Sequence, residues 1–241
     1  MQLNLTYLDA PIPDWLSVAF ALITAVTLWA FVRAVRVAAP RFATSILLGL
    51  VVWLGLIAGM AYGNFFTKLD AFPPRLLIAL IPTLLLIAGL FATPGGRRFV
   101  DALPLSTLTY LNAVRVPVEL VLYGLYVSRQ MPELMTFEGR NVDILAGLTA
   151  PVVAYFTFNH PTLSARGLLI WNVVALLLLS NIVTLAVLSA PLPFQRLAFD
   201  QPNVAVLKFP LVWLPGFVVP VVLLGHLTAI RQLSRIASRL S

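Results

Sequence analysis

The sequence predicts an all-α fold, a polytopic transmembrane helical bundle of about seven spans, in which residues 1–241 form a single domain. Of the 241 residues, 60% are hydrophobic and only 10% are charged, whereas a soluble domain carries about 25% charged residues. The apolar residues form continuous runs, each long enough to cross a hydrocarbon core of about 30 Å as a helix. A β-barrel would instead show short segments of alternating polarity.

The first run follows the segment MQLNLTYLDAPIPD, which has two acids and no Lys or Arg. A cleaved signal peptide needs a basic start, so this run is interpreted as a retained span. The second run is rich in glycine, and the fourth is interrupted by Arg115, Pro117 and Glu119. The fifth ends at the helix-ending sequence NHP, and the prolines of the last run predict a bend. The predicted spans cover residues 15–32, 43–62, 75–93, 104–127, 143–161, 167–190 and 209–230.

The charge distribution predicts that the N-terminus is outside and the C-terminus is cytoplasmic. Cytoplasmic loops are enriched in Lys and Arg, and this orientation places nine basic residues inside and six outside. The inner nine are Arg33, Arg36, Arg41, Arg97, Arg98, Arg166, Arg231, Arg235 and Arg239, and the outer six are Lys68, Arg75, Arg129, Arg140, Arg196 and Lys208. The tail IRQLSRIASRL has amphipathic spacing, which predicts a short helix on the anionic inner leaflet.

The fourth span carries the most informative residues. Arg115 lies near its centre, and Glu119 follows at i+4 on the same face. Asn112 and Tyr123 extend this face into a polar stripe. Burying an arginine at the middle of a bilayer costs at least about 2.5–3.5 kcal/mol, so we expect an Arg115–Glu119 pair that faces the bundle interior. Two interpretations are open: a site for an ion, a proton or an anionic ligand, or a neutralised pair that only stabilises the bundle.

Two loops predicted on the outer side are denser in polar groups than a simple connection requires. Long ordered loops are often lids or binding surfaces, but these loops can equally form a plug that closes the outer end. Together with Asn181 of the sixth span they complete the candidate ligand-binding or structural network. The loop members of this network are Glu138, Arg140, Asn141, Asp143, Asp200, Gln201 and Asn203.

Several classes of chemistry are excluded or disfavoured. The chain has no cysteine, which excludes disulfides, iron–sulfur clusters and thiol nucleophiles. No HExxH, GxSxG or Walker motif occurs, so the sequence favours a protein that is not an enzyme. A retinal Schiff base needs a lysine deep in the last span, and neither Lys68 nor Lys208 lies centrally in a span. Two histidines, His160 and His226, leave open a haem or metal site on the inner side, beside the simpler account of hydrogen-bonded histidines near the headgroups.

Glycines of the second span recur every four residues, at Gly55, Gly59 and Gly63. This spacing lets another backbone approach closely, and the partner can be a helix of the same chain or of a second protomer. The net charge of +7 is scattered between apolar runs. It therefore indicates topology and not binding of nucleic acid.

The segments MPELMTFEGRNVDILAGLTAP, PFQRLAFDQPN and FPLVWLPGFVVP, followed by HLTAIRQL, resemble those of an uncharacterised family of bacterial multi-span membrane proteins. The resemblance covers most of the chain from the fourth span onward and implies a location in the bacterial inner membrane. The leading functional hypothesis is a protein that binds or transports a small ligand or ion on the outer half of the bundle. The alternatives are a structural or assembly subunit of a membrane complex, and a haem- or metal-binding redox protein.

Overall fold

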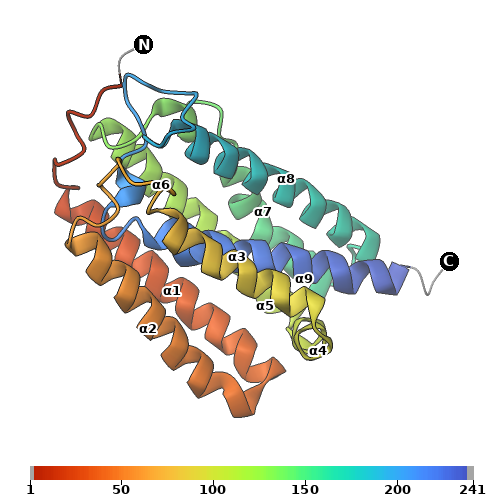
Figure 1. The fold of residues 1–241 in the computed structure, drawn as a ribbon. Coiled ribbons are helices and arrows are strands. Elements are labelled where there is room, and N and C mark those ends of the chain that lie inside the picture. Colours follow the sequence, from red (N-terminus) through yellow and green to blue (C-terminus); the bar gives the residue numbers. More distant parts are fainter. Residues whose placement is uncertain (1–2, 238–241) are drawn as a thin grey trace.

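Helices make up the framework of the computed structural model, which describes residues 3–237 (Figure 1). No strand occurs among these residues, so the all-α fold class is confirmed. The helices are α1 (Asp14–Ala38), α2 (Ala43–Tyr62), α3 (Leu77–Ala92), α4 (Pro94–Ala102), α5 (Leu105–Leu111), α6 (Arg115–Val127), α7 (Ile144–Ala154), α8 (Ala165–Ser189) and α9 (Val219–Ala237).

Four helical segments are long and apolar enough to cross a membrane: residues 14–38, 40–62, 165–189 and 214–236. A fifth is added if α3 and α4, which meet at an angle of 94°, count as one broken span. The predicted fourth span is divided into α5, a 3₁₀ turn and α6, and the predicted fifth corresponds to the shorter apolar helix 144–159. The total of seven spans stays a prediction.

Prolines account for most of the breaks within the helical segments. Pro117 has no N–H for the carbonyl of Ala113, and its ring crowds that carbonyl. The 3₁₀ turn Asn112–Val114 lies at this point, between α5 and α6. Residues Leu214–Val218, which include Pro215, form a π-helical turn that leads into α9, and such turns are common causes of helix bending.

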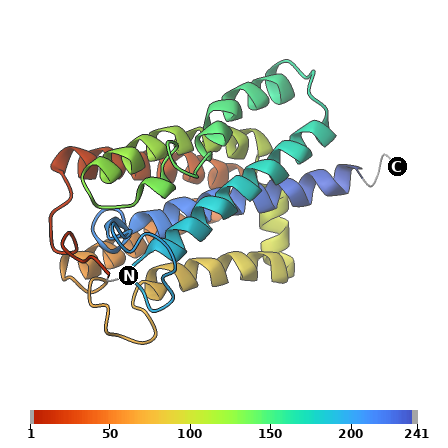
Figure 2. The same ribbon diagram turned by 90° about the horizontal axis from the view of Figure 1, so that it is seen from above.

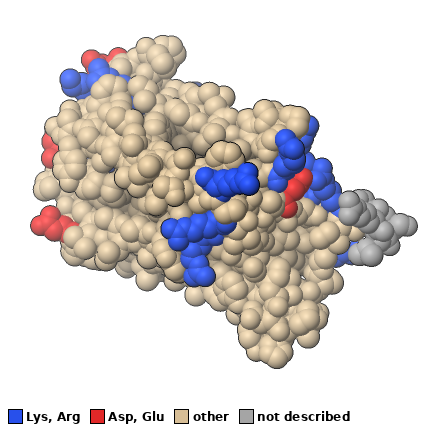
Figure 3. Space-filling model, turned by 90° about the horizontal axis from the view of Figure 1, so that it is seen from below, with Lys and Arg blue, Asp and Glu red and all other residues tan. Residues whose placement is uncertain are grey.

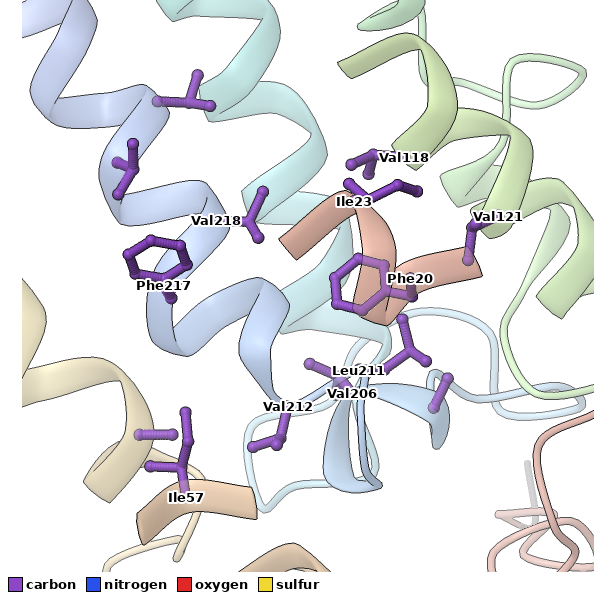
Figure 4. Close-up of a cluster of buried hydrophobic side chains, with 14 of the residues drawn as sticks. Phe20, Ile23, Ile57, Val118, Val121, Val206, Leu211, Val212, Phe217 and Val218 are labelled. Carbon is purple, nitrogen blue, oxygen red and sulfur yellow. The ribbon is translucent and has the colours of Figure 1, made fainter. Parts of the chain in front are cut away.

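The central element of the bundle is α9. It runs through the middle of the bundle in both ribbon views (Figures 1 and 2). Of the residues in its most apolar 18-residue stretch, 61% are buried, whereas the figure for α2 is 17%. Both α8 and α3 pack against it. Apolar side chains of α1, α6 and the segment that precedes α9 fill the space between them, and Figure 4 shows Phe20, Val118, Leu211 and Phe217 within this core.

Segments predicted to share one side of the membrane meet at one end of the bundle. We call this the loop end; it is formed by residues 3–13, 63–76, 128–143 and 190–213. The backbone N–H of Asn4 donates to the carbonyl of Phe199 at 2.9 Å, and the rings of Tyr62 and Phe209 stack with centroids 4.5 Å apart. The grouping of these segments agrees with the predicted topology, and the assignment of the loop end to the outside stays a prediction.

The opposite end carries most of the residues predicted to be cytoplasmic. Asp101 of α4 forms ion pairs with Arg231 and Arg235 of α9, at 2.7 and 2.5 Å, and α4 is thereby fastened to the end of α9. On the face drawn in Figure 3, basic groups gather toward the end that carries the C-terminus, while acidic groups lie mostly at the other end. The predicted amphipathic tail continues past Ala237, so its last part, with Arg239, lies outside the described residues.

Candidate functional site

Arg115 is buried where α6 begins, and its partner differs from the prediction. Its side chain is 3% exposed, and its ion pair is with Asp143, the residue before α7, and not with Glu119. Nε donates to Oδ2 of Asp143 at 2.7 Å, and Nη2 donates to Oδ1. The predicted i, i+4 pair is therefore wrong. Asp143 approaches the guanidinium from the neighbouring segment and accepts two parallel hydrogen bonds, the strongest geometry for such a pair.

Every N–H of the Arg115 side chain already has an acceptor. A guanidinium has five N–H donors, and Asp143 accepts two of them. Nη2 also donates to the carbonyl of Ala175 at 3.1 Å, and Nη1 contacts Nε2 of His226 at 3.2 Å and Oδ1 of Asn112 at 3.5 Å. An incoming ligand therefore finds no unused donor on Arg115.

The contacts of His226 fix its proton arrangement. Because Arg115 can only donate, Nε2 of His226 accepts, and the ring proton is assigned to Nδ1. Nδ1 lies 3.0 Å from Oδ1 of Asn172, which accepts it. Nδ2 of Asn172 donates in turn to the carbonyl of Leu168 at 3.0 Å. A buried chain of hydrogen bonds thus connects α6, α9 and α8.

Glu119 lies one turn further along α6 and is 1% exposed. Both of its carboxylate oxygens accept from Nδ2 of Asn141, at 2.7 Å each. Oδ1 of Asn141 accepts from the backbone N–H of Asp143 at 3.0 Å, so Asn141 bridges the two carboxylates. A carboxylate has about four lone-pair sites, and one amide nitrogen does not use them all.

A cavity of about 180 Å³ adjoins the side chains of Arg115, Glu119 and Asp143. Its polar lining consists of Arg115, Glu119, Asp143 and Asn203, and its remaining walls are apolar side chains, mainly of α3, α8 and the segment leading into α9. Asn203 is 1% exposed, and its Nδ2 donates to the carbonyl of Ala186 at 3.4 Å. Its Oδ1 has no hydrogen-bond partner among the residues that the structure describes. The cavity therefore combines apolar walls with a few polar side chains.

The loop end above the cavity is tied together by buried polar contacts. The carbonyl of Gln130 accepts from the backbone N–H groups of Val204 and Ala205, at 3.1 and 2.9 Å. Nε2 of Gln201 donates to the carbonyl of Met131 at 2.6 Å. These contacts join the two polar loops directly.

Lys208 fastens the N-terminal segment to the same loops. Its Nζ donates to the carbonyls of Tyr7 and Ala10 and to Oε1 of Gln130, at 2.6, 2.7 and 2.7 Å. Burial lowers the pKa of Lys208 to about 8, and the charge of Asp9 acts in the opposite direction. Lys208 therefore connects the N-terminal segment to the loop that contains Gln130.

The remaining predicted site residues lie around the cluster or away from it. Asn112 is buried and contacts Arg115, whereas Tyr123 stacks on Phe137, with centroids 5.1 Å apart. Glu138 is exposed, and Asn181 donates to the backbone carbonyl of Arg140 at 3.0 Å. Arg140, Asp200 and Gln201 line a separate surface pocket of about 600 Å³ at the loop end.

The two histidines occupy different surroundings. His160 is exposed and packs on Tyr155, with ring centroids 4.9 Å apart, whereas both ring nitrogens of His226 are engaged. α9 continues to Ala237, so His226 lies deeper than the predicted position one turn from the end of its span. Within residues 3–237 no group of three or more His, Cys, Asp or Glu is placed to hold a metal ion. The haem or metal alternative stays a prediction.

Sequence reasoning missed Gly147, which lets α7 approach the start of α6. A Cβ added there would lie 2.9 Å from the backbone nitrogen of Val116, closer than real contacts allow. Gly55 and Gly59, which were predicted to admit a helix, have no atom within 4 Å of an added Cβ. Among the described residues, no helix of the same chain fills that face of α2.

The apolar outer surface of the long helices is that of a membrane protein, with side chains such as Trp15, Leu22 and Leu177 more than 60% exposed. Inside this framework, the ion pair of Arg115 and Asp143 is buried. The model of the family described as Domain of unknown function (DUF8737) matches residues 71–234, and the chain belongs to this family. No curated protein and no solved structure matches the chain.

Proposed function

We propose that the protein is a multi-pass inner-membrane protein of seven spans that binds a small, largely apolar molecule in the cavity above Arg115 and Glu119, and passes it between the bilayer and the bundle interior. The observation that carries the proposal is the cavity itself, because a mostly apolar cavity with a few polar groups is the usual form of a ligand site. Its volume of about 180 Å³ exceeds that of a cavity of about 150 Å³ that binds benzene in another protein.

Access from the bilayer, and not from water, fits the surroundings of the cavity. The hydrogen-bonded loops of the loop end close one side of the cavity. Another side is lined by α3 and α8, for example by Leu80 and Val187. Val187 is 37% exposed on the surface of the bundle, so the cavity reaches the surface that faces lipid. Pro215 in the π-helical turn before α9 also lines it, and that turn is the natural place for the wall to move.

The experiment compares two Val→Phe substitutions on α8. Val183 lines the cavity, whereas Val174 is 49% exposed and does not line it. Benzene-sized probes should raise the melting midpoint of the parent and of V174F. At ten times Kd the gain is about 1.4 kcal/mol, or about 3–6 °C. V183F should show no such rise, since its ring occupies the site. Equal shifts in all three proteins would show that the probes act through the detergent or lipid, and the proposal would fail.

A second candidate function, a subunit of a membrane assembly, is favoured by the open face of α2. An added Cβ at Gly55 or Gly59 meets nothing within 4 Å, and α2 is the least buried of the four long apolar segments. A small-residue face of this kind suits close packing with a helix of another chain. Replacement of Gly59 by Leu should then abolish co-purification of a second chain or copy in mild detergent, and a parent that remains a monomer would exclude this candidate.

A further inference from the structure

The polar side chains that line the cavity offer acceptors to a ligand, whereas Arg115 offers no free donor. The five N–H groups of this guanidinium already meet Asp143, Ala175, His226 and Asn112. An anionic head group would have to displace one of these contacts to reach the arginine. The anionic ligand considered from the sequence therefore has no counterpart in the geometry.

Two groups that line the cavity have acceptor capacity left. The Glu119 carboxylate receives hydrogen bonds from a single nitrogen, that of Asn141. Oδ1 of Asn203 receives none from the described part of the chain, although Asn203 lines the cavity and is 99% buried. Its amide orientation is set by the bond from Nδ2 to the carbonyl of Ala186, because the flipped amide would place two acceptors together. A buried acceptor without a donor is costly, and a ligand that donates removes this cost.

The charges around the cavity lead to the same conclusion. The titratable groups that line it are Arg115, Asp143 and Glu119. Arg115 and Asp143 neutralise each other, whereas Glu119 has no ion-pair partner among residues 3–237. A carboxylate head would meet acceptors at Glu119 and Asn203 and no unused donor on Arg115, whereas a hydroxyl or an ammonium group would donate to these acceptors.

We propose that the ligand is a small amphiphile with an apolar body about the size of a benzene ring and one hydrogen-bond-donating head, either a hydroxyl accepted by Oδ1 of Asn203 or a protonated amine accepted by Glu119. The inference rests on the proposed function, because it names the ligand class of the same cavity. The apolar body lies against the apolar side chains of α3 and α8 that line the cavity, and the head replaces none of the hydrogen bonds of the Arg115–Asp143 pair.

The test uses four probes of similar size that differ in their head group: benzyl alcohol, benzylamine, benzoate and toluene. Each is titrated against the purified parent chain in nanodiscs, with V183F as the blank for partition into lipid. We expect benzyl alcohol and benzylamine to bind at least tenfold more tightly than toluene, and benzoate to bind more weakly than toluene. The Asn203→Leu variant should bring benzyl alcohol close to toluene, and Glu119→Gln should reduce the affinity for benzylamine more than that for benzyl alcohol.

The outcomes separate this inference from the proposed function. If toluene or benzoate binds the parent as tightly as benzyl alcohol, and V183F binds none of them, the cavity is a binding site but the donor head is wrong. If no probe distinguishes the parent from V183F, the proposed function itself fails. Glu119→Gln preserves the shape of the side chain, so it supplies the test if Asn203→Leu does not fold.

Discussion

Arg115 and Asp143 depend on each other, because each neutralises the other inside the bundle. Their side chains are 3% and 6% exposed. Replacement of Arg115 by Met alone leaves the Asp143 carboxylate buried without its counter-charge, and we expect a loss of about 3–5 kcal/mol in the free energy of unfolding. The double variant R115M/D143L removes both charges and should lose clearly less. Unfolding curves of the parent, both single variants and the double variant measure the coupling, and additive losses would contradict this account.

Gly147 and Gly59 provide a matched pair of glycines within helices. Gly147→Ala should lower the melting midpoint, because the new methyl group would press against the backbone of Val116 and force α7 away from α6. Gly59→Ala should leave the midpoint equal or slightly higher, since the space around it is open and alanine favours the helix by up to about 1 kcal/mol. Thermal unfolding of both variants in the same detergent checks this. A larger loss for G59A than for G147A would show that the face of α2 is covered in the purified protein.

The residues of the cluster could be predicted from the sequence, but their pairing could not. Arg115, Glu119, Asn141 and Asp143 were all expected at the site, because charged and amide groups in or beside apolar spans need partners. The choice of Asp143 over Glu119 depends on where α7 begins in space, and a helical spacing of four residues holds no information about that. His226 was missed as a partner because its depth depends on how far α9 continues beyond its apolar run.

At the scale of helices, the connection between α4 and α9 depends on one carboxylate. Hydrogen bonding with Arg231, and the charges of Arg231 and Arg235, lower the pKa of Asp101 below its ordinary value, although partial burial acts in the opposite direction. A carboxylate whose pKa is lower in the folded state stabilises the fold above its unfolded pKa of about 4. This stabilisation is lost as the pH falls through the folded pKa.

The Asp101→Asn substitution tests this connection. Near pH 7 the variant should melt earlier than the parent, by an amount equivalent to a few tenths to about 1 kcal/mol, because Asp101 is 29% exposed and the pair is partly screened by solvent. The difference should begin to shrink when the pH falls below about 4, because Asp101 of the unfolded parent is then protonated first, and it should be lost once the pH falls through the lowered folded pKa. Melting midpoints of both proteins at pH 7, 5 and 3.5 give the comparison. A difference that does not depend on pH would mean that the ion pairs do not fasten α4.

The positions of helix breaks were more predictable than helix lengths. The proline in the fourth span and the prolines before α9 are local causes, and breaks occur near both. The right-angle turn between α3 and α4 was not foreseen. Pro94, Gly95 and Gly96 begin α4 there, and a Cβ at Gly96 would lie 2.4 Å from the carbonyl oxygen of Leu90. This close approach depends on the fold of the turn, and a glycine pair in a sequence is equally compatible with a plain loop.

At the scale of the whole molecule, charge and topology reinforce each other. Hydrogen bonds join three segments of the loop end, 3–13, 128–143 and 190–213, and Tyr62 at the end of α2 stacks on Phe209, whereas Asp101 with its arginines lies at the opposite end. An up-and-down path through seven spans returns the chain to these two ends in this order. The number of membrane spans depends mainly on the segment 144–159, which is apolar but shorter than the other candidates. If residues 144–159 cross the membrane, they are the first of the last three spans. The loop before α7 and the C-terminal end of α9 then lie on opposite sides of the membrane.

Single cysteines can decide this point, because the chain has none of its own. Glu138 lies in the loop before α7 and Ser234 lies near the end of α9, and both are exposed. With seven spans and an outer N-terminus, a membrane-impermeant maleimide added to intact cells should label E138C, and S234C should react only after permeabilisation. The reverse pattern would keep the span count but invert the orientation predicted from Lys and Arg. Labelling of both from the same side would mean that two spans and not three separate them, so that residues 144–159 enter the bundle without crossing the bilayer.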